Sequence, residues 1–212
     1  MDRYLENSLD ISLMDLLEIM QAKVLGSTYY FGIQTLKFPI DFWIYQEILF
    51  ETRPDVVIEI GNYKGGSTLA IAHILDNLNH GKIIAIDIDH SNISEVVIKH
   101  PRINLLTLNA SSAFDRVKNL INQDDNVLII DDSSHTFENT LDLLRKYSSL
   151  IKNGNYFIVE DGICHHGLDV GPNPGPFEAI EQFARENPDF EIDRTKEKFL
   201  ITWNPKGFLR RK

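Results

Sequence analysis

The sequence predicts an α/β protein: a Rossmann-like, doubly wound, mostly parallel sheet closed by a C-terminal antiparallel hairpin. Three observations support this prediction. From about residue 56 onwards, short apolar runs rich in Val and Ile alternate with segments of helical periodicity. These runs lack polar–apolar alternation, as expected for strands covered on both faces. Carboxylates recur at the ends of these runs, at the rim where parallel α/β sheets bind ligands.

Length and composition are those of one soluble domain. The chain has 212 residues, 43% of them hydrophobic, and a net charge of −10. This charge argues against a nucleic-acid partner, and no run approaches the roughly 20 apolar residues of a membrane span. The start carries no apolar signal segment, and the single cysteine, Cys164, fits a reducing compartment. We therefore expect a cytoplasmic protein with no nucleic-acid or membrane partner.

The first 50 residues predict an N-terminal helical segment that precedes a domain over residues 51–212. Residues 10–24 carry apolar side chains at helical spacing, so they are expected to pack on the core or on another subunit. An aromatic-rich stretch follows, and its side chains are expected to pack in the core or an interface, with lining of the acceptor pocket as the alternative. Pro39 and Asp41 open a second helix, which ends at Arg53-Pro54.

Strands and helices then alternate, which implies βαβ units with right-handed crossovers. The last two apolar runs, FEID and KFLITW, are separated by only four residues, too few for a crossover, so they are predicted to form the hairpin. The basic tail after them, residues 210–212, is expected to be solvated. Strands are predicted at 56–60, 82–88, 103–108, 127–131 and 156–160, and helices at 66–78, 92–99, 112–122, 136–152 and 177–186.

A glycine-rich turn follows the first strand, in Glu59-Ile60-Gly61-Asn62-Tyr63-Lys64-Gly65-Gly66-Ser67. Glycines let the backbone approach a ligand, and the next helix offers free N–H groups. The dinucleotide and Walker glycine patterns are both absent. An acid before the turn would repel a pyrophosphate but suits a cofactor with an ammonium or sulfonium group. A purely structural turn is the alternative.

The second and third strands end in groups that suit a nucleoside. Asp87 lies where an acid commonly accepts hydrogen bonds from both ribose hydroxyls, although it could be a solvated strand end. Asp89 is expected to be a partner or surface group. Asn109-Ala110-Ser111 offers small polar groups where an adenine edge could lie.

Three carboxylates follow two further strands: Asp132, Glu160 and Asp161. Together they form a hard oxygen site suited to Mg²⁺, which would orient a substrate hydroxyl and lower its pKa. His135, one helical turn from Asp132, is placed to take or relay the proton. The alternatives are a helix N-cap for Asp132 and an ordinary hydrogen-bonding role for His135. His165 and His166 lie in a long loop, where a lid role and no role are about equally expected.

With these residues in view, the chain resembles class I S-adenosylmethionine-dependent methyltransferases, and among them the family named for cephalosporin hydroxylase and rhamnosyl O-methyltransferase. The resemblance runs from about Phe31 to the end. It is carried by KFPIDFWIYQE, RPDVVIEIGNYKGGS, IIAIDID, IIDDSSH, GNYFIVED and KFLITWNPKGFLRR.

This resemblance implies Mg²⁺-assisted O-methylation of a hydroxyl on a small molecule or saccharide, with S-adenosyl-L-methionine as cofactor. It also implies a homo-oligomer whose N-terminal segment covers a neighbour's site. Catechol O-methyltransferases carry a lysine where this chain has His135, so the identity of the base stays open. The implied positions are Glu59, Gly61, Tyr63 and Ser67 for the methionine end and turn, Asp87 for ribose, Ala110 and Ser111 for adenine, and Asp132, Glu160 and Asp161 for the metal.

Other functions stay open at this point. Asp87-Ile88-Asp89-His90-Ser91 imitates the start of a Mg²⁺-dependent phosphohydrolase, but that reading leaves the glycine-rich turn without a role. A non-catalytic nucleoside-binding domain would have no use for the three later carboxylates. An oxygenase lacks a clear two-histidine, one-carboxylate set, although His165, His166 and Asp161 could imitate one.

Overall fold

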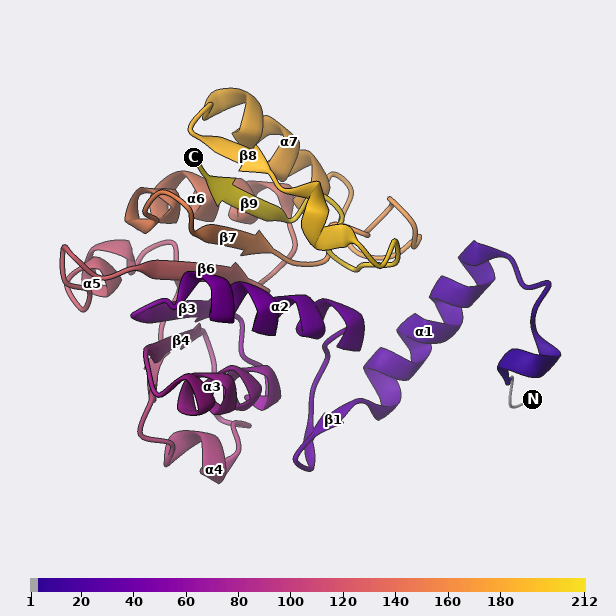
Figure 1. The fold of residues 1–212 in the computed structure, drawn as a ribbon, viewed down its shortest axis with the longest axis horizontal. Helices are drawn as coiled ribbons and strands as arrows, with labels where there is room; N and C mark the ends of the chain where they lie inside the picture. The colour runs from indigo at the N-terminus through magenta and orange to yellow at the C-terminus, as the bar shows by residue number, and fades with distance from the viewer. Residues whose placement is uncertain (1–3) are drawn as a thin grey trace.

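A computed structural model describes residues 4–212 and contains a seven-stranded sheet with helices on both faces (Figure 1). The strand order is β5-β4-β3-β6-β7-β9-β8, and β9 runs in the direction opposite to the other six strands. The order reverses between β3 and β6, so ligands are expected at the carboxyl ends of these two strands. The strands are β3 (Val56–Ile60), β4 (Lys82–Asp87), β5 (Ile103–Thr107), β6 (Val127–Asp131), β7 (Tyr156–Val159), β8 (Phe190–Ile192) and β9 (Phe208–Arg211).

Two layers of helices cover the sheet. Helices α2 and α3 pack on one face, and α5, α6 and α7 pack on the other. Residues of β3 point alternately into the two layers: Val56 and Ile58 face α6 and α7, whereas Val57 faces α2 and α3. The helices are α1 (Leu13–Ser27), α2 (Pro39–Thr52), α3 (Gly66–Leu78), α4 (Glu95–Ile98), α5 (Phe114–Lys118), α6 (Phe137–Tyr147) and α7 (Pro176–Glu186), with short 3-10 turns at Leu5–Asn7, Ser148–Leu150 and Arg194–Glu197.

Burial on both faces explains the continuous apolar strands. Every residue of β3 and β6 is buried, including the acids Glu59 and Asp131. Such strands gain hydrophobic free energy from both sides, so a Val/Ile run without alternation is the expected sequence. The predicted fold class is confirmed, and β3, α3 and β6 have the predicted bounds.

The predicted position of the second hairpin strand is wrong. Residues 198–203 form no strand, and the strand that pairs with β8 is β9, which includes part of the tail predicted to be solvated. Phe208 and Leu209 are fully buried between β7 and β8, and Arg211 donates a hydrogen bond to the carbonyl of Ile151 at 2.5 Å. The antiparallel strand is therefore the last but one in the sheet.

The segment over residues 198–203 packs elsewhere because its end is held by α2. The backbone N–H of Trp203 and the hydroxyl of Thr202 both donate to Asp41, at 2.8 and 2.5 Å. The Trp203 ring stacks on Phe38 at a centroid distance of 3.9 Å. Leu200 points to solvent and is 84% exposed, which no core strand would tolerate.

The N-terminal segment extends away from the sheet (Figure 1). Ser12 caps α1 by accepting a hydrogen bond from the backbone N–H of Asp15 at 3.1 Å. A two-residue hairpin, β1 (Tyr29–Tyr30) with β2 (Ile33–Gln34), follows α1. Because α2 belongs to the core, the predicted division near residue 50 falls within a core helix, and the separate role of the N-terminal segment stays a prediction. No helix in residues 4–212 is long and apolar enough to cross a bilayer.

Candidate functional site

A cavity of about 830 Å³ opens at the carboxyl ends of the central strands. Its walls come from the turns after β3, β4 and β6, the loop after β7, α1, and the segment that joins β2 to α2. The cavity therefore lies at the rim where the acids were predicted to gather. Of the predicted residues, it is lined by Gly61, Tyr63, Ser67, Asp87, Ala110, Asp132, His135 and Asp161.

The turn after β3 approaches the turn after β6 very closely. Gly61 has a φ of +88°, and a Cβ there would lie 1.9 Å from the backbone oxygen of Asp132. The backbone N–H of Asp132 in turn donates to the carbonyl of Ile60 at 2.8 Å. Only glycine fits this position, because both its backbone conformation and its contact exclude a side chain. The two halves of the site are thus joined by backbone.

Glu59 lies beneath this turn and is fully buried. Its carboxylate accepts hydrogen bonds from Ser67 Oγ at 2.6 Å, Asn62 Nδ2 at 3.0 Å and Thr68 Oγ1 at 2.5 Å. Burial raises its pKa above the ordinary value. The carboxylate does not line the cavity, so it holds the turn onto the start of α3. Its direct contact with a cofactor stays a prediction.

Asp87 lines the cavity and orders the same turn. One carboxylate oxygen accepts the backbone N–H groups of Asn62 and Tyr63, at 2.7 and 3.3 Å. The other accepts the N–H of Asp89 at 3.2 Å. The Tyr63 hydroxyl donates to Gln34 Oε1 at 3.2 Å, linking the turn to β2. Asp87 is thus held at the rim, where the predicted ribose contact would form.

The two residues predicted for adenine differ in position. Ala110 lines the cavity, and its carbonyl accepts a hydrogen bond from the Tyr147 hydroxyl at 2.7 Å. Ser111 does not line the cavity; it contacts Asp142 and accepts from Lys146 Nζ at 2.8 Å. The structure therefore gives Ser111 a role in attaching this loop to α6.

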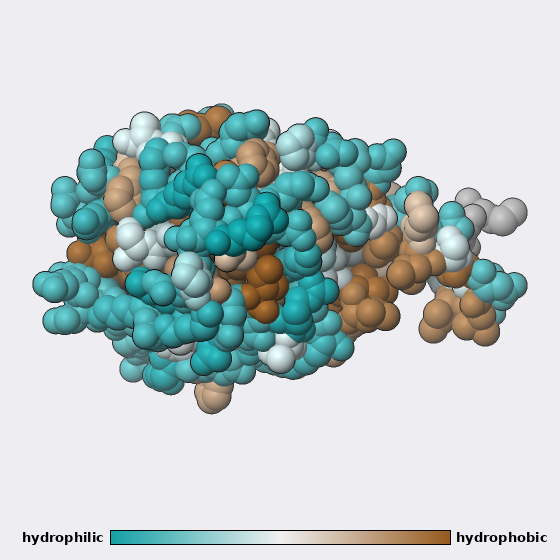
Figure 2. Space-filling view, turned by 90° about the horizontal axis from the view of Figure 1, so that it is seen from above, coloured by the Kyte–Doolittle hydropathy of each residue, from teal (hydrophilic) through white to brown (hydrophobic). Residues whose placement is uncertain are grey.

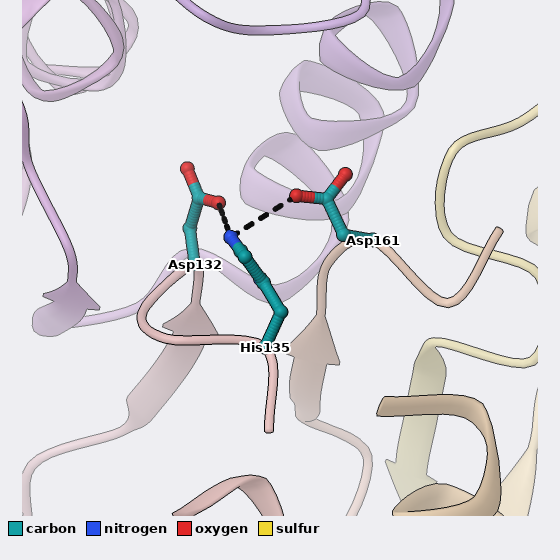
Figure 3. Close-up of side chains that lie close together, drawn as sticks. All are labelled: Asp132, His135 and Asp161. Carbon is teal, nitrogen blue, oxygen red and sulfur yellow. Dashed lines mark ion pairs between the residues drawn. The ribbon is translucent and has the colours of Figure 1, made fainter. Parts of the chain in front are cut away.

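Asp132, His135 and Asp161 meet across the ends of β6 and β7 (Figure 3). His135 Nε2 lies 3.3 Å from Asp161 Oδ2 and 3.9 Å from Asp132 Oδ1. Each of the three residues offers one atom that could bind a metal, and these three atoms lie within 4.8 Å of one another. The two carboxylate oxygens suit a hard divalent cation such as Mg²⁺ or Mn²⁺, whereas an imidazole nitrogen is a ligand that softer metals prefer. The carboxylates of Asp132 and Asp161 therefore fit a Mg²⁺-type ion, and His135 Nε2 stays beside it.

Two of these three residues adopt a left-handed backbone conformation. His135 and Asp161 each have a φ of +56°. This conformation costs a non-glycine residue of the order of 1 kcal/mol and is common at functional sites. The two side chains point toward each other, His135 from the turn after β6 and Asp161 from the end of β7 (Figure 3).

Glu160 lies apart from that group and is 6% exposed. It contacts the ammonium of Lys37, which also donates to Asp132 Oδ2 at 2.7 Å. Burial alone would lower the pKa of Lys37, but the Asp132 and Glu160 carboxylates raise it, so the side chain is cationic. Burial and the neighbouring Asp132 raise the pKa of Glu160. Asp131, the acid before Asp132, is buried with one oxygen accepting from Ser133 Oγ at 2.6 Å.

Sequence reasoning missed Lys37. It precedes α2 in the segment KFPID, and its partners lie 95 and 123 residues further along the chain. No local periodicity or motif signals such a contact. The only available signal is that Lys37 opens the first block of the family resemblance, KFPIDFWIYQE.

Comparison with known proteins adds a family. The model of the family described as Rhamnosyl O-methyltransferase/CmcI matches residues 22–212. The rhamnosyl O-methyltransferase of Mycobacterium leprae (strain TN) is 34% identical over 197 residues, covering 89% of this chain and 85% of that protein. The protein of the same name from Mycobacterium tuberculosis (strain ATCC 25618 / H37Rv) is 34% identical over 191 residues, covering 86% and 77%.

Solved structures share the fold. A CmcI structure with Mg and SAM superimposes with a TM-score of 0.71 at 23% identity, covering 87% of this chain and 76% of that one. An O-methyltransferase from Bacillus cereus in complex with SAH gives a TM-score of 0.59 at 17% identity, covering 90% and 87%. At these identities the two structures establish a common fold.

Proposed function

This chain belongs to the Rhamnosyl O-methyltransferase/CmcI family, and we propose that it transfers the methyl group of S-adenosyl-L-methionine to a hydroxyl group with the assistance of Mg²⁺. One observation carries the proposal: the cavity joins the turn after β3 to the Asp132–His135–Asp161 group. A cofactor site and a divalent-metal site thus share one space. Membership of this family sets aside the phosphohydrolase and the non-catalytic alternatives.

The cofactor half of the cavity is built on the turn after β3. We propose that this turn and Ser67 hold the methionine end, that Asp87 accepts the ribose hydroxyls, and that Ala110 lies against adenine. Glu59 supports this half from beneath. The names of two solved structures support a cofactor of this kind, because the CmcI structure contains SAM and the Bacillus cereus enzyme contains SAH.

The metal half would hold Mg²⁺ between Asp132 and Asp161, with Glu160 as the third predicted ligand. A bound divalent ion supplies a lowered pKa for an acceptor hydroxyl and fixes its position. His135 Nε2, 3.3 Å from Asp161 Oδ2, is placed to take the hydroxyl proton, and that carboxylate would stabilise the imidazolium. Alignment of the oxygen with the reactive methyl group is the main task left to the enzyme.

The acceptor is proposed to carry a saccharide hydroxyl beside an apolar part. Two relatives are named rhamnosyl O-methyltransferases, which supports a sugar. The side of the cavity near α1 and the loop after β7 is mostly apolar, and Gln21 adds a polar group there. The apolar lining residues on this side are Val24, Leu25, Ile163, Val170 and Trp203.

We further propose that the protein is a cytoplasmic homo-oligomer assembled through its N-terminal segment. Leu9, Leu13 and Met14 are 76, 53 and 66% exposed. Figure 2 shows hydrophobic atoms gathered on the segment that projects to the right. Exposed apolar side chains on a projecting segment favour burial against another subunit.

Replacement of Asp132 tests the metal-assisted reaction. Asp132→Ala removes an oxygen ligand, so turnover that depends on Mg²⁺ should be lost while S-adenosylhomocysteine still binds. The measurement is transfer of labelled methyl from S-adenosylmethionine to a rhamnosyl glycoside, with and without excess chelator. Asp124→Ala, at an exposed acid outside the cavity, is the matched control. Full activity of Asp132→Ala, or full activity in chelator, would refute the metal role.

A further inference from the structure

The ammonium of Lys37 lies between the cavity and Glu160. Lys37 and Asp132 line the cavity, whereas Glu160 does not. The Lys37 side chain is 7% exposed, as is that of Glu160. A divalent ion that enters the cavity therefore meets Asp132 and Asp161 first, and it reaches Glu160 only if Lys37 gives up its contact.

Lys37 also decides which way Asp132 faces. Asp132 Oδ2 accepts from Lys37 Nζ at 2.7 Å, and this leaves Oδ1 directed toward His135, 3.9 Å away. Lys37 thus divides the carboxylates into two sets. Glu160 and one oxygen of Asp132 are paired with it, while the other oxygen of Asp132 and Asp161 stay available to a metal.

The charges around Lys37 explain why a cation lies at this buried place. Asp132, Glu160 and Asp161 follow neighbouring strands, and one buried and two half-buried carboxylates without a cation would repel one another. One ammonium at the centre offsets this repulsion. A divalent ion offers the same carboxylates a stronger attraction, so the two cations compete.

We propose that Lys37 is a positioning residue that acts as the internal cation of the metal site and competes with the divalent ion for Glu160. This inference rests on the proposed metal-assisted function. With Lys37 present, the ion must displace the ammonium before Glu160 can act as its third ligand, so the affinity for the ion is lowered. Without Lys37, Glu160 becomes free to join Asp132 and Asp161, and the ion is bound more tightly.

The experiment is a metal titration of Lys37→Met, followed by the shift in melting temperature without cofactor or acceptor. Metal-free Lys37→Met should melt about 10 °C below wild type, because it leaves a buried carboxylate unpaired. In MgCl₂ or MnCl₂ its melting temperature should rise more than that of wild type, corresponding to about tenfold tighter binding. Lys37→Arg, which keeps the cation, should respond to metal like wild type.

Two further variants identify the cause. Lys37→Met combined with Glu160→Gln should lose the extra metal response, because the gain depends on the Glu160 carboxylate. This double variant also removes the uncompensated charge, so it provides a folded protein if Lys37→Met alone does not fold. Lys64→Met should leave the metal response unchanged, since Lys64 pairs with the neutral amide of Gln34 at 2.9 Å.

Every outcome bears on the inference. An unchanged or smaller metal response in Lys37→Met, or a gain that persists in the double variant, overturns it. If Lys37→Met does not fold, restored stability in the double variant supports the pairing, and an unfolded double variant overturns it. Absence of methyl transfer in the wild-type protein would instead count against the proposed function, because the melting experiment involves neither cofactor nor acceptor.

Discussion

At this site the type of residue that a position accepts depends on how closely two backbone segments approach each other, as well as on side-chain chemistry. Gly61 is predicted from the sequence as part of a glycine-rich turn, and the structure shows the contact that requires it. The same φ of +88° occurs at Gly154, where an added Cβ would meet nothing within 4 Å. The two glycines therefore separate the cost of the backbone conformation from the cost of the contact.

Replacement of these glycines by alanine should give unequal losses. Gly154→Ala should lower the free energy of unfolding by about 1 kcal/mol, because only the backbone conformation is strained. Gly61→Ala should cost about 3 kcal/mol or more and should weaken binding of S-adenosylhomocysteine, because the backbone of Asp132 must move. Chemical denaturation measures the change in the free energy of unfolding, and calorimetric titration measures the binding of S-adenosylhomocysteine. Equal effects of the two substitutions would contradict the role of the contact.

The positions of the acids at the ends of the strands can be predicted from local sequence. Asp132, Asp161 and Asp87 are predicted to lie at one rim because parallel strands end on the same side, and all three line the cavity. Glu59 lies near the end of one such strand, but its side chain is buried against the start of α3 and does not line the cavity. Lys37 lies outside the alternation of strands and helices, so the strand-end argument has no reason to include it.

At the scale of elements, Asp41 ties the start of α2 to the segment before β9. It accepts hydrogen bonds from Thr202 and the backbone of Trp203 and is 5% exposed. Burial raises the pKa of Asp41 to about 7, despite these hydrogen bonds. The folded protein therefore keeps a proton on Asp41 at pH values where the unfolded chain, with a pKa of about 3.9, has released it.

This difference predicts a loss of stability as the pH rises. The tighter binding of this proton by the folded protein stabilises it, and this stabilisation is fully present below about pH 4 and is lost progressively up to about pH 7. Between pH 5 and pH 8 the loss should be about 3 kcal/mol relative to Asp41→Asn, which stays neutral. Urea denaturation of both proteins across this range measures it. Parallel pH profiles for the two proteins would show that Asp41 does not titrate in this way.

Helices and strands are predicted well where a local apolar pattern is enough to identify them. They are predicted less well where two apolar segments could occupy the same place in the sheet. The strands at 56–60 and 127–131 are buried on both faces, so their runs are unambiguous. KFLITW is also an apolar run, yet Trp203 packs with Phe38 and α1 while β9 takes the place in the sheet. Only one segment can pair with β7 on this side of the sheet, and amino-acid composition does not show which of the two apolar segments it is.

At the scale of the whole molecule, the N-terminal segment connects the cavity with the surface. Leu17 and Val24 of α1 pack with Ile163 and Trp203, so α1 reaches the site of its own chain. The preceding turn and the outer side of α1 expose Leu9, Leu13 and Met14 instead. One helix thus lines the cavity and also exposes apolar side chains, where the proposed contact with another subunit would form.

Charges on this surface should dissociate the proposed oligomer. Leu13→Glu combined with Met14→Lys places two ionised groups where apolar side chains are expected to be buried, and such burial is very costly. Light scattering coupled to gel filtration should then give a mass near the 24.3 kDa of one chain. Lys118→Glu, on the short helix α5, is a control for a change of surface charge. A wild-type protein that already elutes as a monomer would contradict this assembly.

By itself, the sequence determined the fold class, the family and the rim at which the acids collect. Alternation of buried strands with helices leaves a chain few ways to bury its apolar surface, and parallel strands must end on one side. Only the tertiary structure decided which acids face the cavity, which apolar segment forms the last strand, and that Lys37 lies among the carboxylates. Those outcomes depend on competition between residues far apart in the chain for the same buried space, and no local pattern records that competition.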